Sequence, residues 1–481
     1  VLNNSSFKKT KNNFIKNFEK IILDNSSDYF ILSSPFLFIS KLRTDKEINI
    51  QKTYFFSCII KIFFFSIINV IRRINFLKEY QNNKNLKNIK NIFVSHLTYT
   101  NNNSKLFHDN YFGDIPNLDK SKNLIIYIPH KIDQLSTNLK KNLNKSKNKI
   151  FVIKRHSSYP KEFYKIILFF LKSILLLIKS LKKKDNYEKW FLKKLSLSLV
   201  SETSLQTISD VDNIYKIIEK SNCDKVFLPF EGFSWERVLI HKIKSNKKSC
   251  MIFGYVNYGV FENQLSLFSK VHSKLYPDKI LTSGKVIKEL LISKKILGEN
   301  LIINIGSTRF KNTKHNIVTS RGKLGILIVL EALNSEIDLL INLCLELSNI
   351  QNKYLIYIKF HPLTNIQKYS NVFKNNQNIY LFDNNYKDMK YTIFRGSTSI
   401  IDSIKYGSIP LYFSSNTILN LNPLYFFFYS KLIIKNSKDF LEFDKKNDVI
   451  LKNIDMKKLT KYSKHYYEAL KVSKILKIMS D

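Results

Sequence analysis

The first candidate for acid–base chemistry is Glu231, in the segment Phe227–Arg237 (FLPFEGFSWER). An apolar run precedes this glutamate and a helical pattern follows it, so we expect its carboxylate at the carboxyl end of a strand. Gly232 permits a tight turn, and Glu236 and Arg237 begin the helix, where they could contact the same ligand. A carboxylate placed there can take the proton from an attacking hydroxyl group. The alternative is an acid that caps the helix beside a buried tryptophan.

A second candidate site, Lys359–Leu363 (KFHPL), also ends an apolar run. His361 offers a donor nitrogen, Pro362 fixes the following backbone, and Lys359 adds positive charge nearby. Together these residue types can hold a phosphate group. The alternative is a histidine with a purely structural role.

A third candidate, Phe394–Asp402 (FRGSTSIID), places small hydroxyl residues between a strand and a helix. Backbone N–H groups and the positive end of the helix dipole favour phosphate at such a turn. The protein groups expected to bind this phosphate are a guanidinium, a glycine amide and three hydroxyls, from Arg395, Gly396, Ser397, Thr398 and Ser399. The alternative is a helix cap without a ligand.

Arginine is rare in this chain, since only eight of its 78 basic residues are arginine. Four of the eight lie at predicted strand ends, namely Arg155, Arg237, Arg309 and Arg395. Bidentate binding of phosphate or carboxylate explains this choice, and so does structural pairing with acids. We expect Arg155 and Arg309 to contact a donor or acceptor. The turn Ser283–Gly284 (LTSG) ends another predicted strand and is assigned the same role.

Short β-branched or aromatic runs alternate with helical patterns over most of the chain, which predicts parallel sheets covered by helices on both faces. The first series of strands is expected at Ile92–His96, Leu124–Ile128, Ile150–Ile153, Lys225–Phe230 and Met251–Val256. The second is expected at Lys279–Thr282, Leu301–Ile305, Gly325–Leu330, Tyr354–Phe360, Asn378–Phe382, Tyr391–Phe394 and Ile409–Phe413.

The fold class predicted from these series is α/β, with two Rossmann-like doubly wound domains facing a cleft. The expected division is an N-terminal, partly helical region at 1–90, one domain at 91–270, a second at 271–425 and a helical segment at 426–481. Ligands bind such sheets beyond the carboxyl ends of the strands, where the three candidate motifs fall. No GxGxxG pattern is present, which argues against a dinucleotide-dependent redox enzyme.

The net charge of +40 comes almost entirely from lysine, spread over every segment. This distribution lacks the arginine-rich motifs of nucleic-acid readers, so we expect no nucleic-acid partner and instead an attraction to anionic surfaces. The four scattered cysteines have no metal-ligand spacing, and no secretory signal pattern opens the chain. We therefore expect a cytoplasmic protein without a metal site.

Two apolar stretches, 54–71 and 164–181, are interrupted by lysines. In the second, Lys165, Lys172 and Lys179 recur every seven residues and so share one side of a helix. Such a helix can lie in a membrane interface, with its lysines reaching the phosphate head groups. Packing in the protein core is the alternative, and the mid-span lysines argue against a spanning helix.

The motifs FEGFSWER, LTSG, GSTRF, KFHPL and RGSTSIIDSIKYGSIPLYF, in this order, resemble bacterial GT-B transferases of surface-carbohydrate loci. The chain is most similar to surface carbohydrate biosynthesis proteins found beside nonulosonic-acid genes, and more distantly to bacterial sialyltransferases, over roughly residues 92 to 415. Two positions depart from those families. Phe230 stands where sialyltransferases prefer a second acid, and Asn257–Tyr258 where relatives often carry a histidine.

The resemblance implies a glycosyltransferase of surface polysaccharide biosynthesis. Glu231 would be the base, and His361–Pro362 with Ser397–Ser399 would hold the donor phosphate. It implies inverting, metal-independent transfer of an acidic nonulosonic or sialic-type sugar from a CMP-linked donor to a glycan or lipid-linked glycan. The nucleotide-sugar is a substrate, and no cofactor is expected. The expected location is peripheral, on the inner face of the cell membrane. Two alternatives stay open: a CDP-polyol phosphotransferase of the teichoic-acid type, and a non-enzymatic basic protein that binds membrane or nucleic acid.

Overall fold

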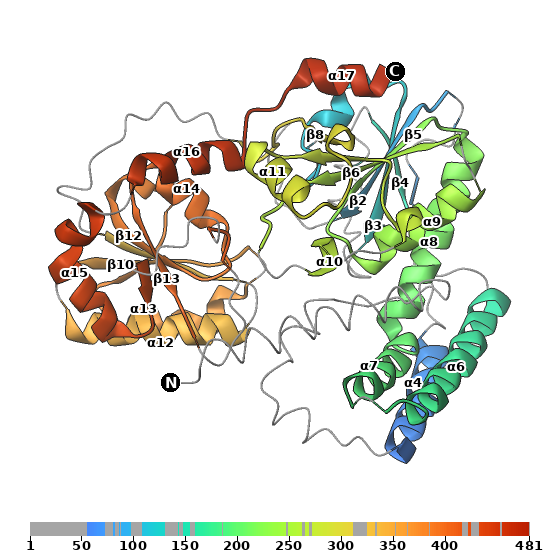
Figure 1. The fold of residues 1–481 in the computed structure, drawn as a ribbon, viewed down its shortest axis with the longest axis horizontal. Coiled ribbons are helices and arrows are strands. Elements are labelled where there is room, and N and C mark those ends of the chain that lie inside the picture. The colour runs from blue at the N-terminus through green and yellow to red at the C-terminus, as the bar shows by residue number, and fades with distance from the viewer. Residues whose placement is uncertain are drawn as a thin grey trace.

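The structure of the protein is a computed structural model (Figure 1). It describes residues 55–72, 80–81, 86, 88–97, 108–129, 143, 148–153, 159–184, 186–246, 249–261, 265–268, 272–310, 325–331, 334–351, 353–362, 364–383, 385–415, 422–424, 432–452 and 455–480.

The first sheet has the strand order β1-β4-β3-β2-β5-β6-β7-β8. All its neighbouring strands pair in parallel except β1, which runs antiparallel to β4. Most of its strand residues are buried, as expected when helices cover both faces of a parallel sheet. The strands are β1 (Tyr80–Gln81), β2 (Asn91–Leu97), β3 (Asn123–Pro129), β4 (Lys149–Val152), β5 (Lys225–Pro229), β6 (Met251–Val256), β7 (Lys279–Thr282) and β8 (Ile302–Asn304).

The second sheet has the order β11-β10-β9-β12-β13-β14, and all its strands are parallel. Its strands are β9 (Gly325–Val329), β10 (Leu355–Lys359), β11 (Ile379–Leu381), β12 (Met389–Phe394), β13 (Ile409–Phe413) and β14 (Ile433–Ile434). The predicted fold class of two Rossmann-like α/β domains is thereby confirmed.

Helices connect the strands and cover the sheets (Figure 1). They include α8 (Glu202–Ser221), α9 (Ser234–Asn246), α11 (Lys285–Ser293), α12 (Asn334–Ile350) and α14 (Ser399–Lys405). Shorter helices are α10 (Leu265–Phe268) and α13 (Ser370–Lys374), and α15 (Ser437–Lys452), α16 (Met456–Tyr466) and α17 (Val472–Ser480) follow the second sheet.

The predicted boundary between the domains at residue 270 is wrong. β7 and β8 pair with β6 and complete the first sheet, so the first domain extends to Asn304 and the second sheet begins at Gly325. Alternating strands and helices show that a parallel sheet exists, but they do not show which of two sheets a strand joins. That choice depends on which edge the crossover reaches.

Each sheet contains one point where the chain reverses its direction of winding. In the first sheet this point lies between β2 and β5, and in the second between β9 and β12. The connections leave such a pair of strands toward opposite faces, which opens a crevice at their carboxyl ends. Glu231 follows β5, and Gly396 follows β12.

A helical unit made of α4 (Phe55–Arg72), α6 (Tyr159–Leu181) and α7 (Asn186–Leu199) stands apart from both sheets in Figure 1. Helices α6 and α7 belong to the crossover between β4 and β5, and α8 leads from this unit back to the first sheet. No helix in the described part of the chain combines the length and apolar content needed to cross a bilayer.

The C-terminal segment joins the two domains. Helix α16 packs against α14 of the second domain and α11 of the first. Beyond it, α17 buries Ile475 and Met479 in the core of the first domain, and Lys225 donates a hydrogen bond to the Met479 carbonyl oxygen (3.1 Å).

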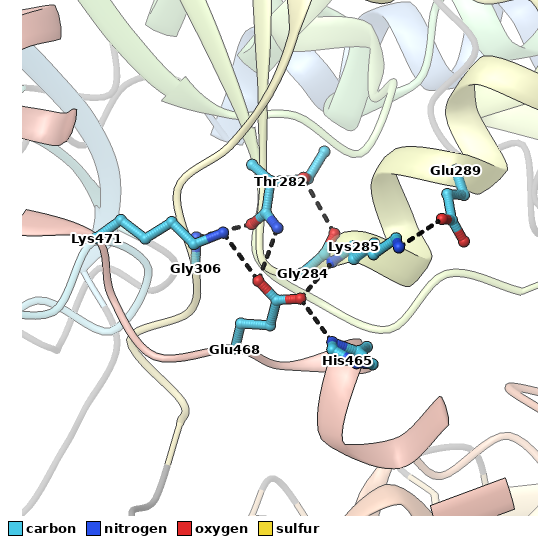
Figure 2. A network of polar contacts seen from close by, with 9 residues as sticks. Thr282, Gly284, Lys285, Glu289, Gly306, His465, Glu468 and Lys471 are labelled. Carbon is cyan, nitrogen blue, oxygen red and sulfur yellow. Dashed lines mark hydrogen bonds and ion pairs between the residues drawn. The ribbon is translucent and has the colours of Figure 1, made fainter. Parts of the chain in front are cut away.

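Glu468, between α16 and α17, is the centre of this junction (Figure 2). Its carboxylate accepts hydrogen bonds from Asn304 Nδ2 (2.8 Å) and the Lys285 backbone N–H (3.3 Å), and it pairs with Lys471 (2.9 Å) and His465 (3.0 Å). Burial alone would raise the pKa of Glu468, but these donors lower it to about 2. The ionised carboxylate therefore fastens the C-terminal segment to β8 and to the start of α11.

We expect Glu468→Gln to destabilise the protein at neutral pH by on the order of 1–3 kcal/mol. The folded-state pKa of about 2 lies below the ordinary value of 4.5, so this stabilisation is present above pH 4.5 and is lost as the pH falls toward 2. Thermal unfolding of both forms across this range should show a difference in midpoint that disappears at low pH. Glu442→Gln, in an exposed pair with Lys446, is the control and should change the midpoint little.

Candidate active site

The turn between β5 and α9 holds Glu231 in place through a glycine and a close backbone contact. Gly232 has a φ of +77°, in the left-handed region that glycine tolerates best. A Cβ at this position would lie 1.9 Å from the carbonyl oxygen of Ser266, so no larger residue fits without a shift of α10. Gly232 therefore has a structural role in the turn, and its predicted contact with a ligand is not needed to explain it.

Glu236 anchors the same turn from the first turn of α9. Its buried Oε2 accepts hydrogen bonds from the backbone N–H groups of Glu231 (2.9 Å), Gly232 (2.7 Å) and Phe233 (3.0 Å). Burial raises the pKa of Glu236, and these three donors oppose that shift. The capping acid considered from sequence is thus Glu236, whose Oε2 is held by the backbone, and its contact with substrate stays a prediction.

Arg237 supports the turn from the other side. Its Nε donates to the Gly232 carbonyl oxygen (3.2 Å), its Nη2 donates to the Ser266 carbonyl oxygen, and its guanidinium lies over the rings of Phe230 and Tyr276. Nε and Nη2 of its guanidinium are thus held by the protein backbone, and the substrate contact predicted for Arg237 stays a prediction.

Glu231 joins this cap only through its backbone N–H, and its own carboxylate accepts none of these hydrogen bonds. Burial raises the pKa of Glu231 to about 7, and the guanidinium of Arg309 opposes this shift. The Glu231 carboxylate in turn contributes to the raised pKa of Tyr111, after the larger effect of burial, so the two side chains lie close together. An acid with a pKa near 7 is available as an ionised base at physiological pH and still binds a proton well.

Three aromatic side chains that sequence reasoning did not assign lie near Glu231. His96, at the end of β2, is 5.1 Å from the ring of Trp235 and 5.7 Å from that of Tyr111, measured between centroids. Asn257 donates a hydrogen bond to the Tyr111 carbonyl oxygen (2.6 Å). The sequence could have suggested His96 as a site residue, since this histidine ends a predicted strand and ligands bind beyond strand ends. The position of His96 beside Trp235, in the helix that follows Glu231, depends on β2 and β5 being neighbours.

The second domain contributes His361, immediately after β10. Burial lowers the pKa of His361, and Arg309 lowers it further. Arg309 therefore acts electrostatically on Glu231 of the first domain and on His361 of the second, and lies between the two motifs. Pro362 follows in an exposed turn.

Lys359 is directed toward aromatic rings of its own domain. Its Nζ donates to Tyr386 Oη (2.5 Å) and lies 5.0 Å from the centre of the Tyr386 ring. Burial raises the pKa of Tyr386, and a hydrogen bond with Ser399 opposes the shift. Tyr386 thus connects the end of β10 to the first residue of α14, which brings the KFHPL and RGSTS motifs together as predicted.

The predicted role of Arg395 as a phosphate ligand is wrong. Its side chain is fully buried, pairs through Nε with Glu336 and donates from Nη1 to the Phe413 carbonyl oxygen (2.8 Å). Structural pairing with an acid, the alternative considered from sequence, explains this arginine. Arg395 fixes the backbone that carries Gly396 and the three hydroxyl residues after it.

Glu331 is a further acid that the sequence did not reveal as a site residue. It follows β9, and its Oε1 accepts a hydrogen bond from the Gly396 backbone N–H. Burial and the neighbouring Glu336 raise the pKa of Glu331 to about 7. It lies at the switch point of the second sheet, as Glu231 does in the first. The Gly396 amide, predicted to bind phosphate, is occupied by this carboxylate.

The post-strand loops of the two domains meet beside these residues. A Cβ on Gly259, after β6, would lie 1.9 Å from Cγ2 of Thr398. Burial raises the pKa of Tyr467, and Arg309 and Thr398 both oppose the shift, so all three side chains lie together. Ser397, Thr398 and Ser399 are partly exposed, and a ligand at these hydroxyls stays a prediction.

Two other predicted contacts have different outcomes. The turn Ser283–Gly284 is covered by the C-terminal segment. A Cβ on Gly284 would lie 2.3 Å from the His465 carbonyl oxygen. The Ser283 carbonyl oxygen accepts a hydrogen bond from the Glu468 backbone N–H (2.9 Å). Its predicted ligand contact is therefore wrong. Arg155 lies outside the described residues.

No protein-family model matches the chain. Among curated proteins it is similar to a 1-deoxy-D-xylulose 5-phosphate reductoisomerase of Malacoplasma penetrans, with 25% identity over 271 residues that cover 50% of this chain and 67% of that protein. At this identity the match does not assign a family.

Solved structures with a similar fold include the S. aureus MnaA–UDP complex (11% identity, TM-score 0.43, 80% of this chain and 94% of that one). The lipopolysaccharide outer core galactosyltransferase WaaB is also similar, with 11% identity, a TM-score of 0.43 and coverage of 81% of this chain and 99% of that one. A third is the UDP-N-acetylglucosamine 2-epimerase from Rickettsia bellii, with 14% identity, a TM-score of 0.41 and coverage of 81% of this chain and 96% of that one. At these scores the likeness assigns neither a substrate nor an activity.

The structural role of Arg395 can be tested through its partner. We expect Glu336→Gln to destabilise the protein by about 3–5 kcal/mol, because the arginine is left buried without its counter-charge. Thermal unfolding measures the loss, and Glu289→Gln, in an exposed pair with Lys285, should leave the midpoint nearly unchanged. An unchanged midpoint in Glu336→Gln would contradict the structural assignment.

Proposed function

We propose that this protein is a glycosyltransferase that moves a sugar from a nucleotide donor to a hydroxyl of a glycan acceptor, with Glu231 as the general base. The observation that carries the proposal is the placement of Glu231. It follows β5 at the switch point of the first sheet, its pKa is raised to about 7, and Glu236 performs the capping in its place. Arg309 connects this acid electrostatically to His361 of the other domain.

In the proposed reaction, the acceptor hydroxyl oxygen attacks the anomeric carbon while its proton passes to a Glu231 carboxylate oxygen. The bond between the anomeric carbon and the donor phosphate oxygen breaks, and the nucleotide leaves with its bonding electron pair. Attack opposite the leaving group inverts the configuration. Arg309, His361 and the hydroxyls of Ser397–Ser399 would bind the leaving phosphate, and such stabilisation of developing charge contributes much of enzymatic rate enhancement. In this proposal the reaction needs no metal ion.

The donor follows from the sequence resemblance alone. It implies a CMP-linked acidic sugar of the nonulosonic or sialic type for surface polysaccharide synthesis, and a CDP-polyol is the second candidate. The inner membrane face as the location belongs to the same proposal.

Substitution Glu231→Gln tests the catalytic role. We expect kcat to fall by roughly 10²–10⁴-fold, because the amide cannot accept the acceptor proton, while nucleotide affinity changes little. The control is the thermal stability of the variant. Because the pKa of Glu231 is raised, ionising this group destabilises the folded protein, increasingly as the pH rises from 4.5 through about 7. Glu231→Gln should therefore unfold at the same or a higher temperature than the wild type at pH 8. Unchanged turnover would remove Glu231 as the base, and a wild type that turns over neither donor would support a binding protein instead of an enzyme.

The pH profile tests the environment of the base. We expect kcat/KM to fall about tenfold per pH unit below about pH 7 and to level off above it, because only ionised Glu231 accepts a proton. Arg309 lowers the pKa of Glu231, so Arg309→Gln should move the midpoint of this limb to higher pH, whereas Arg309→Lys should leave it closer to the wild-type position. An identical midpoint in all three forms would exclude Glu231 as the titrating base.

A nucleotide panel tests the donor. Selective binding raises the melting temperature by mass action. We expect CMP to raise it more than CDP, UDP or GDP, and turnover of a CMP-sugar in preference to a CDP-polyol. A response to UDP or CDP alone would remove the CMP assignment and keep the transferase, and no response to any nucleotide would contradict both.

A further inference from the structure

The outer side of α6 is apolar although no described part of the chain covers it. Tyr164, Ile167, Leu171, Leu175 and Ile178 are between 42% and 65% exposed. Steps of three or four residues place them along one side of the helix. The opposite side buries other apolar residues against α4, α7 and α8, so the helix is apolar on two sides, and packing explains only one of them.

Helix α4 repeats this arrangement next to α6 (Figure 1). Ile60, Phe63, Phe64 and Ile67 are exposed, whereas Cys58 and Ile62 on the other side are buried with Leu177 of α6. Together these exposed residues of α4 and α6 form the outer apolar surface of the helical unit. Exposed apolar surface of this extent marks an interaction site in a soluble domain.

The charge around this surface is almost entirely positive. Residues 159–184 contain seven lysines and one acid, Glu162. At about 100° per residue, Lys172 and Lys179 fall along one edge of the exposed stripe. Lys179, Lys182 and Lys184 are exposed at the end of α6, and Lys61 is exposed on α4. Lys165 was predicted to reach the head groups together with Lys172 and Lys179. Instead it pairs with Asp212 of α8 (2.8 Å).

This combination favours an anionic bilayer over a second copy of the chain. Apolar side chains edged by lysines match an interface in which acyl chains lie below negatively charged head groups. Two copies docked through this surface would bring their lysines together, which is unfavourable.

The surface is firmly connected to the candidate active site. Helix α6 begins beyond β4, at the sheet edge where Glu231 follows the parallel strand β5. Asp212 of α8 pairs with both Lys165 of α6 and Lys242 of α9. Helix α9 is the one that begins immediately after the Glu231 turn.

We propose that the outer apolar surface of α4 and α6 docks in the interface of a bilayer containing anionic phospholipid. This docking would hold the Glu231 edge of the first domain near the membrane, where a lipid-linked acceptor presents its glycan. The acceptor class rests on the proposed function, whereas the docking does not.

The test is co-sedimentation of the full chain with vesicles of phosphatidylcholine alone, or of phosphatidylcholine with phosphatidylglycerol in equal amounts. We expect binding to the anionic vesicles that weakens with salt, and at least tenfold weaker binding of the double variant Phe63→Glu/Leu175→Glu. Lys179→Gln/Lys182→Gln should weaken binding roughly fivefold for each lysine removed. The matched controls, Val449→Glu on α15 and Lys457→Gln/Lys461→Gln on α16, should bind as the wild type does.

Loss of wild-type binding, or equal loss in the Val449→Glu control, would overturn the docking surface. So would a lipid-free dimer, seen by analytical ultracentrifugation, that Phe63→Glu/Leu175→Glu dissociates, because a second copy would then be the occupant. Each variant is also tested for its nucleotide-induced rise in melting temperature. A variant that keeps this nucleotide response but loses vesicle binding supports the docking surface. If the wild type binds vesicles but responds to no nucleotide, the docking proposal stands and the transferase proposal fails.

Discussion

The arrangement of the two domains depends on the carboxylate of Glu468. It accepts from Asn304 and the start of α11 in the first domain, and it lies two residues beyond α16, which packs on α14 of the second. A partly buried carboxylate such as that of Glu468 stays ionised most readily where donors and cations surround it. Here two of those donors come from the first domain, so the ion is satisfied only when the C-terminal segment is docked. The loops carrying Gly259 and Thr398 meet in the same arrangement.

Three acids near the strand ends differ in how their charge is compensated. Glu236 and Glu336 are compensated, the first by three backbone N–H groups and the second by Arg395, and each fixes a turn after a strand. Burial raises the pKa of Glu231 to about 7 against the field of Arg309, and burial also raises the pKa of Glu236 despite its three donors. The compensated acids supply rigidity to the turns, and this rigidity makes it possible to hold an uncompensated carboxyl group at a defined position.

The helical unit of α4, α6 and α7 is joined to this site by an ion cluster and a small apolar contact. Asp212 lies between two lysines from α6 and α9, and Ile166 and Phe169 of α6 pack with Leu205 of α8 against Val238 of α9. Any surface that the unit contacts is therefore held in a defined relation to the helix that follows Glu231. The proposed docking at a membrane and the proposed transfer reaction thus use surfaces that α6, α8 and α9 connect.

The sequence by itself determined the local features of this protein. Apolar runs followed by glycine, histidine or hydroxyl residues identified the strand ends, the two parallel sheets, and Glu231 and His361 at their edges, because strand, turn and helix preferences act over a few neighbouring residues. Tertiary structure alone decided the partners. Strand order placed β7 and β8 in the first sheet, put His96 beside Trp235, and gave Arg237, Glu236 and Arg395 structural roles that their types could not distinguish from ligand binding. Burial also raised the pKa of Glu231 and Arg309 opposed that shift, because both effects depend on groups distant in the chain that the fold brings together.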